Sequence, residues 1–200
     1  MTSETDPIPI PSGHDPREAV LDQWLVLRSQ DGDAEAFSRL VRRWTPRLVR
    51  HARRLLDTTE EANDAAQDAW LSITGGLHKL NDPATFRRWA YRITTRRCAD
   101  RVRKNQRVRR SDAGAARPEL AAEPEFSGDD IDQLRAAIRT LPTERRLVLA
   151  LLYVDGLTVA EIAAVLEIPT GTVKSRLRLA RDELRRILDP EATSTKGVTR

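Results

Sequence analysis

The chain has 200 residues, which is room for one or two domains, and its 34 basic and 30 acidic side chains give a formal net charge of +4. Thirty of the basic residues are arginines, whose planar guanidinium groups suit phosphate and carboxylate partners. The sequence contains no apolar run long enough to cross a bilayer and no signal peptide, and a single cysteine excludes an internal disulfide. We therefore expect a cytoplasmic protein without direct membrane insertion.

The possible metal ligands do not form a pattern. Cys98 and the three histidines, His14, His51 and His78, are scattered and lack the spacing of zinc ligands. We expect no metal site, no cofactor, no catalytic residue and no small-molecule substrate.

Helical periodicity and composition divide the chain into five segments. Residues 1–16 hold four prolines and few apolar side chains, which predicts a disordered lead-in. Residues 17–110 and 129–189 have helical patterns, and no alternating strand pattern with hairpin turns occurs. Residues 111–128 are typical of a linker, and residues 190–200 of a frayed tail. The predicted fold class is all-α, with two small helical domains joined by a flexible acidic linker.

The charges are segregated along the chain. Residues 39–54 hold seven arginines and no acid, residues 101–110 hold six cations and no acid, and residues 119–132 hold six acids and no cation. Such asymmetry indicates a nucleic-acid partner, with a solvated arginine-rich face as the alternative.

The first long helix is predicted from an apolar stripe at three- and four-residue spacing. The stripe consists of Phe37, Leu40, Val41, Trp44, Leu48, Ala52 and Leu55. Pro46 lies within it and predicts a kink or a break, because proline removes a backbone donor and clashes one turn back.

A second helix is predicted from about residue 58 to the glycine pair at 75–76. Asp64, Gln67 and Asp68 share one face of it, because they are three and four residues apart. A docking surface for a basic partner is the favoured interpretation, and a solvated face is the alternative. A catalytic carboxylate pair is disfavoured, since carboxylates near a helix start are explained by the helix dipole.

A third helix is predicted to start at Asp82 and Pro83, which are typical cap and first-turn residues. We expect its buried face to contain Phe86, Trp89, Ala90 and Ile93. Four basic residues share one other face, which suits a row of phosphates or, alternatively, is only solvated. They are Arg88, Arg92, Arg96 and Arg103.

The second helical segment has the pattern of a helix-turn-helix. Thr158 and Glu161 form a capping box before a short helix, residues 167–169 form a turn, and Thr170 is expected to cap a longer helix. The expected inward residues of that helix are Val173, Leu177, Ala180, Leu184 and Ile187. The expected outward residues are Lys174, Ser175, Arg178 and Arg181. An ordinary helical hairpin with a charged face is the alternative.

Taken in order, these motifs resemble the bacterial RNA polymerase sigma factors of the extracytoplasmic-function group (group IV). The N-terminal half resembles sigma region 2 in the motifs Gly32-Asp33-x-x-Ala36-Phe37, Asp64-x-x-Gln67-Asp68-x-Trp70 and Phe86-Arg87-x-Trp89-x-Tyr91-Arg92-Ile93. The C-terminal half resembles sigma region 4 in Leu141-Pro142, Gly156-Leu157-Thr158-x-x-Glu161-Ile162-Ala163 and Gly171-Thr172-Val173-Lys174-Ser175-Arg176-Leu177.

The resemblance implies binding to core RNA polymerase, recognition of promoter DNA and, in many members, restraint by an anti-sigma factor. It implies that Asp64, Gln67 and Asp68 dock on the polymerase. For the −10 element it implies His78, Lys79, Asn81, Arg88, Arg92, Arg96 and Arg103. For the −35 element it implies Thr172, Lys174, Ser175, Arg176, Arg178 and Arg181.

Several positions depart from the family pattern. Leu179 stands where the family often has arginine, and Arg96 where it often has asparagine. Glu167 stands at a turn position where many helix-turn-helix units have glycine, and the pair Gly75-Gly76 is unusual before the −10 loop.

Two other functions stay open. A stand-alone helix-turn-helix regulator would need a sensor or dimerisation domain, for which the N-terminal half shows no pattern. An enzyme acting on nucleic acid would need a grouped set of nucleophiles or metal ligands.

Overall fold

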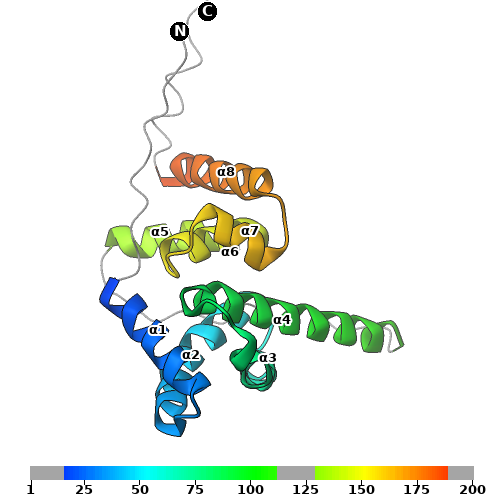
Figure 1. Ribbon diagram of the computed structural model, residues 1–200. Coiled ribbons are helices and arrows are strands. Elements are labelled where there is room, and N and C mark those ends of the chain that lie inside the picture. The colour runs from blue at the N-terminus through cyan, green and yellow to red at the C-terminus, as the bar shows by residue number, and fades with distance from the viewer. Residues whose placement is uncertain (1–15, 112–128, 189–200) are drawn as a thin grey trace, which may run out of the picture. The chain divides into compact units, whose positions relative to one another are not determined.

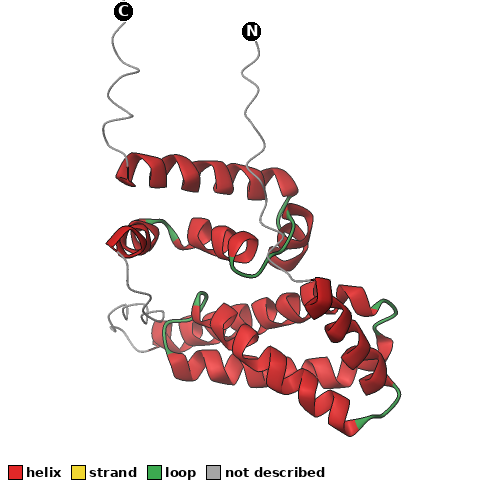
Figure 2. Ribbon diagram, turned by 90° about the vertical axis from the view of Figure 1, so that its left-hand side faces the viewer, coloured by secondary structure: helices red, strands yellow, loops and turns green. Residues whose placement is uncertain are grey.

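A computed structural model describes residues 16–111 and 129–188, and all regular elements in these ranges are helices (Figures 1 and 2). The all-α prediction is therefore confirmed for the described chain. The predicted lead-in, linker and tail lie outside the described residues, except for one residue at the end of the lead-in and one at the start of the linker. Helix α2 packs against α1, α3 and α4, and α8 packs against α5 and α6.

The N-terminal unit contains four α-helices and two short 3₁₀ helices. Their bounds are α1 Pro16–Gln30, α2 Ala34–Arg53, α3 Thr59–Gly76, η1 Leu77–Lys79, η2 Pro83–Thr85 and α4 Phe86–Ser111. Trp44 of α2 is at the centre of the core, with its ring edge-on to Phe86 at 5.2 Å and to Tyr91 at 5.8 Å between ring centroids. Burying three aromatic rings at one point makes a large contribution to the stability of this unit.

The motif Gly32-Asp33 has a local structural role at the start of α2. Gly32 has a φ of +88°, a left-handed conformation that costs glycine little. Asp33 then caps the helix by accepting hydrogen bonds from the backbone N–H groups of Glu35 and Ala36, both at 3.0 Å. The Ala36 N–H and the Arg28 guanidinium hold the pKa of Asp33 below its usual value.

The sequence predicted a kink or a break at Pro46, and the break does not occur, because α2 continues through the proline. Trp44 and Leu48 are fully buried on either side of the proline. The packing of both flanking turns into one core outweighs the loss of a single backbone hydrogen bond. Tertiary contacts therefore override the local signal.

The buried face of α4 differs from the prediction. Phe86 and Ala90 are buried as expected, but Trp89 and Ile93 are only half-buried. The remaining buried positions are Tyr91, Thr94 and Cys98. Burial raises the pKa of the Cys98 thiol to about 12, so the thiol stays protonated at neutral pH.

A partly buried ion-pair network joins α1 to α2. Asp22 is 6% exposed, and its carboxylate lies 2.6 Å from Nε of Arg43 and 3.6 Å from a guanidinium nitrogen of Arg47. Glu18 completes the network, with 2.9 Å to Arg47 and 3.4 Å to Arg43. Removing one member of such a network leaves buried charge without compensation.

We expect Asp22→Asn to lower the free energy of unfolding by about 3 kcal/mol, because two half-buried guanidinium groups lose their main carboxylate. Urea denaturation of the full chain measures this value. Asp31→Asn, at an exposed position just after α1, is the matched control. A loss no larger than the control's would contradict the prediction.

The C-terminal unit contains α5 Asp129–Thr140, α6 Thr143–Tyr153, α7 Val159–Leu166 and α8 Thr170–Leu188. The capping box is confirmed: Glu161 accepts a hydrogen bond from the Thr158 N–H at 2.8 Å, and its own N–H donates to the Thr158 hydroxyl at 3.2 Å. Glu167 has a φ of +56° in the turn between α7 and α8, a conformation that costs a non-glycine residue of order 1 kcal/mol.

The inward face of α8 is mostly as predicted. Val173, Leu177 and Ala180 are buried, whereas Leu184 is half-buried and Ile187 is 42% exposed. The helix packs on α5 and α6, and its fully buried side chains lie between Val173 and Ala180. Thr170 is the first helical residue rather than the cap, because the Pro169 carbonyl accepts from the Val173 N–H at 3.2 Å.

Candidate docking and nucleic-acid interfaces

The acidic face of α3 is bound by an arginine of α4. Arg101 donates to Asp64 at 3.2 Å and to Asp68 at 2.8 Å, so one guanidinium bridges both carboxylates. Asp64 and Asp68 are still 56% and 46% exposed, and Gln67 is exposed beside them. The three predicted docking residues therefore lie together on one accessible surface, with part of their charge offset by Arg101.

Leu71 belongs to the same face and was not singled out from the sequence. It is 75% exposed, the highest value among the large apolar side chains of the described residues that are exposed. Its spacing from Asp64, Gln67 and Asp68 is seven, four and three residues, which places all four on one stripe of α3. The signal that could have found it was an apolar residue extending an otherwise polar stripe.

The basic face of α4 is accessible but not wholly unpaired. Arg88, Arg96 and Arg103 are exposed, and Arg92 is half-buried. Arg103 pairs with Asp100 at 2.9 Å. The four arginines thus have the shared face that their spacing predicts, and Arg103 is partly neutralised by Asp100 on the same helix.

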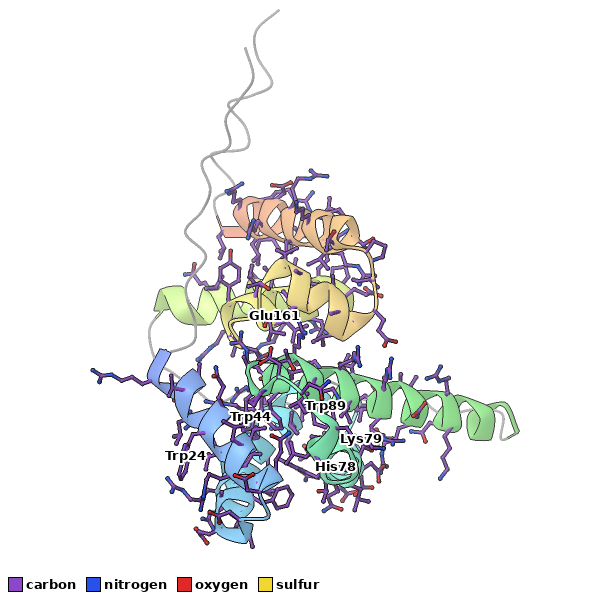
Figure 3. All side chains as sticks on the ribbon, in the orientation of Figure 1. Trp24, Trp44, His78, Lys79, Trp89 and Glu161 are labelled. Carbon is purple, nitrogen blue, oxygen red and sulfur yellow. The ribbon has the colours of Figure 1, made fainter. Side chains whose placement is uncertain are left out.

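The segment between α3 and α4 presents polar side chains to solvent. His78 and Lys79 lie on η1 and are exposed, and Asn81 follows in the loop, also exposed (Figure 3). Asp82 caps η2 by accepting a hydrogen bond from the Ala84 N–H at 3.0 Å. These three predicted residues are therefore brought together on one short loop at the start of the basic helix.

The first turns of α8 carry the predicted −35 residues. Lys174, Ser175 and Arg178 are exposed, and Arg178 lies 3.3 Å from Asp182 one turn later. Thr172 and Arg176 are half-buried. Because Val173 and Leu177 face the core, the residues that follow each of them turn outward.

Arg181 is held by a different contact. It is half-buried, with its Nε 3.1 Å from the Tyr153 hydroxyl and its guanidinium 5.8 Å from the centre of the Tyr153 ring. Arg181 therefore sits at the flank of the exposed surface formed by the other basic residues of α8.

Metal sites and membrane-spanning helices are both absent among the residues that the structure describes. No group of three or more histidine, cysteine or carboxylate side chains there could hold a metal ion. His51 is fully buried, with Nε2 2.8 Å from the Thr95 hydroxyl. None of the helices is both long and apolar enough to cross a membrane.

Comparison with known proteins covers both units. The Sigma-70 region 2 family matches residues 40–108, and the Sigma-70 region 4 family matches residues 131–184. The extracytoplasmic-function (ECF) RNA polymerase sigma factor SigW of Bacillus subtilis is 31% identical over 82% of this chain and 94% of its own length. SigM of Mycobacterium tuberculosis strain H37Rv is 33% identical over 84% of both chains.

Two solved structures are similar to this chain in fold. CnrH, in complex with the cytosolic domain of CnrY, is similar with a TM-score of 0.57 and 25% identity over 86% of this chain and 99% of that one. RpoE of Bartonella quintana, in complex with the anti-sigma factor NepR, has the same fold with a TM-score of 0.66 and 21% identity over 79% and 99%. With two sigma regions in order and relatives matched over nearly their whole length, the chain belongs to the ECF family of RNA polymerase sigma factors.

Proposed function

We propose that this chain binds core RNA polymerase in the cytoplasm and directs it to promoters, with region 2 at the −10 element and region 4 at the −35 element. The observation that carries the proposal is the presence of both sigma regions in one chain, each with an accessible charged surface. Sigma factors are not enzymes, which agrees with the expected lack of catalytic residues. We propose residues 17–110 and 129–189 as the two domains.

Run-off transcription tests this function directly. Purified core polymerase is incubated with genomic fragments, with and without the chain, and the transcripts are mapped. We expect discrete transcripts that start at a fixed distance from a shared upstream sequence only when the chain is present. Identical transcripts with core polymerase alone would contradict the proposal. A stand-alone regulator, the alternative function, would instead bind duplex operator DNA without polymerase.

We further infer the surfaces that would make these contacts. Asp64, Gln67, Asp68 and Leu71 form the proposed polymerase-docking face of α3. The loop with His78, Lys79 and Asn81 and the four arginines of α4 form the proposed −10 surface. The exposed start of α8, with flanking contributions from Thr172, Arg176 and Arg181, forms the proposed −35 surface. An anti-sigma factor is a proposed further partner, supported by the complex in which the similar RpoE was solved.

Leu71→Ala is expected to weaken binding to core polymerase by about tenfold, because burying an exposed leucine side chain in an interface removes apolar surface from water. The stability of the free chain should not change, since the side chain is 75% exposed. Titration of labelled core polymerase measures the affinity. Leu27→Ala, at a half-exposed leucine of α1, is the control, and equal affinities of the two variants would contradict the role of Leu71.

Alanine at Arg88, Arg92 or Arg103 is expected to weaken the salt dependence of promoter binding. Each substitution should reduce the slope of log binding constant against log salt concentration by about one unit, because an arginine that contacts a phosphate displaces a counterion and alanine does not. Holoenzyme binding is measured at several salt concentrations on two promoters. Arg42→Ala, an exposed arginine of α2, is the control. A changed −10 preference with an unaltered slope would assign the residue to base readout instead.

A further inference from the structure

Gln30, the last residue of α1, is hydrogen-bonded to the backbone of the loop before α4. Its side-chain amide nitrogen donates to the carbonyl oxygens of Leu77 and Leu80, both at 2.8 Å. These carbonyls are 47 and 50 residues away in sequence and lie at either end of a single turn. Leu80 N–H also donates to the Leu77 carbonyl at 3.1 Å. The Gln30 side-chain amide therefore binds both ends of a turn that already has its own backbone hydrogen bond.

The other end of the loop is held as well. The Asp82 carbonyl accepts from the Thr85 hydroxyl at 2.7 Å and from the Thr85 N–H at 3.0 Å. Asn81 therefore lies between two backbone anchors, and the exposed Lys79 lies beside the first. A loop with a fixed backbone and exposed polar side chains presents those side chains in a defined geometry.

The helix that leads into the loop is also closely fitted. A Cβ atom at Gly76 would lie 3.0 Å from the six-membered part of the Trp89 indole. A side chain at position 76 would therefore press against Trp89 of α4, so glycine allows this close approach of α3 to α4. Figure 3 shows His78 and Lys79 on this segment, with Trp89 labelled on α4. Gln30 thus links the end of α1 to this loop through two side-chain hydrogen bonds.

We propose that Gln30 is a positioning residue for −10 recognition: by fixing the carbonyls of Leu77 and Leu80, it sets the presentation of Lys79 and Asn81 to promoter bases. The inference rests on the proposed function, because it assumes that this loop reads the −10 element. Gln30 does not contact DNA in this role, since both of its amide hydrogens are directed at the protein backbone.

The test compares Gln30→Met, which keeps the length of the side chain and removes both donors, with Gln23→Met on the same helix. Run-off transcription is measured on a wild-type promoter, on single-base −10 variants and on single-base −35 variants. We expect Gln30→Met to reduce discrimination among −10 variants by about tenfold, as the loss of two modest hydrogen bonds implies, and to leave discrimination among −35 variants unchanged.

Each outcome has a distinct meaning. Unchanged −10 discrimination, or an equal fall on every promoter, overturns the inference, since a merely structural role lowers activity without changing preference. Backbone amide exchange at residues 80–82 gives a second measurement that does not need polymerase. It should be faster in Gln30→Met than in Gln23→Met, and equal rates overturn the inference. If the wild-type chain supports no promoter-specific transcript, the proposed function fails, and the −10 role fails with it.

Discussion

Reversing both carboxylates of the α3 docking face, with Asp64→Arg and Asp68→Arg, is expected to lower the affinity for core polymerase at least about 100-fold. Charge reversal within an interface costs several kcal/mol, because it replaces attraction to a basic partner by repulsion. The structure adds a second contribution: the new arginines would lie beside Arg101, which now bridges the two carboxylates. Three guanidinium groups would then occupy the face that is proposed to meet the polymerase.

The controls separate the carboxylates from their intramolecular pair. Arg101→Gln removes the bridge and leaves both carboxylates in place, so it should not reproduce the loss of affinity. Asp31→Arg with Glu35→Arg makes the same change in net charge away from α3. Affinity is measured by titration with labelled core polymerase, and thermal unfolding shows that each variant is folded. Affinity close to wild type in a folded variant would refute the docking assignment.

The second large effect that we expect is a change in −35 sequence preference in Lys174→Ala and Arg178→Ala of α8. Both side chains are exposed one turn apart, in the N-terminal half of α8. In a helix-turn-helix these turns reach the base edges of the major groove. Lysine and arginine suit the acceptors of guanine, and a good contact contributes about 1–3 kcal/mol of discrimination.

Neighbouring residues of α8 limit which other side chains can read bases. Arg178 lies 3.3 Å from Asp182, an exposed pair that DNA can displace at small cost. Leu179, at a position where arginine is common in the family, is 38% exposed and offers no hydrogen bond. Ser175 lies beside Lys174 on the exposed face, although its hydroxyl donates to the Thr172 carbonyl at 2.9 Å.

A randomised −35 library, transcribed by wild type and by each variant, tests the assignment. We expect Lys174→Ala and Arg178→Ala each to relax preference at different positions of the element. Arg185→Ala, at an exposed residue in the last turns of α8, is the matched control and should keep the wild-type preference. If both test variants keep that preference and lose only overall activity, the two side chains contact the DNA phosphates and do not read bases.

The sequence alone determined the features that depend on near neighbours in the chain. The caps at Asp82 and Thr158 lie where they were predicted, because a cap is a contact between residues two or three apart. The shared faces of α3, α4 and α8 follow from helical spacing for the same reason. The two sigma regions were identified from motifs of this short-range kind.

Only the tertiary structure decided the features that depend on distant partners. Helix α2 runs through Pro46 because both of its flanking turns are buried in one core, and the buried side of α4 includes Cys98 because α4 packs along α3. The bridge from Arg101 to Asp64 joins residues 37 apart, and the Gln30 anchor joins residues up to 50 apart. The periodicity of a single helix cannot predict such pairs. They form only when burial of the core brings separate helices together.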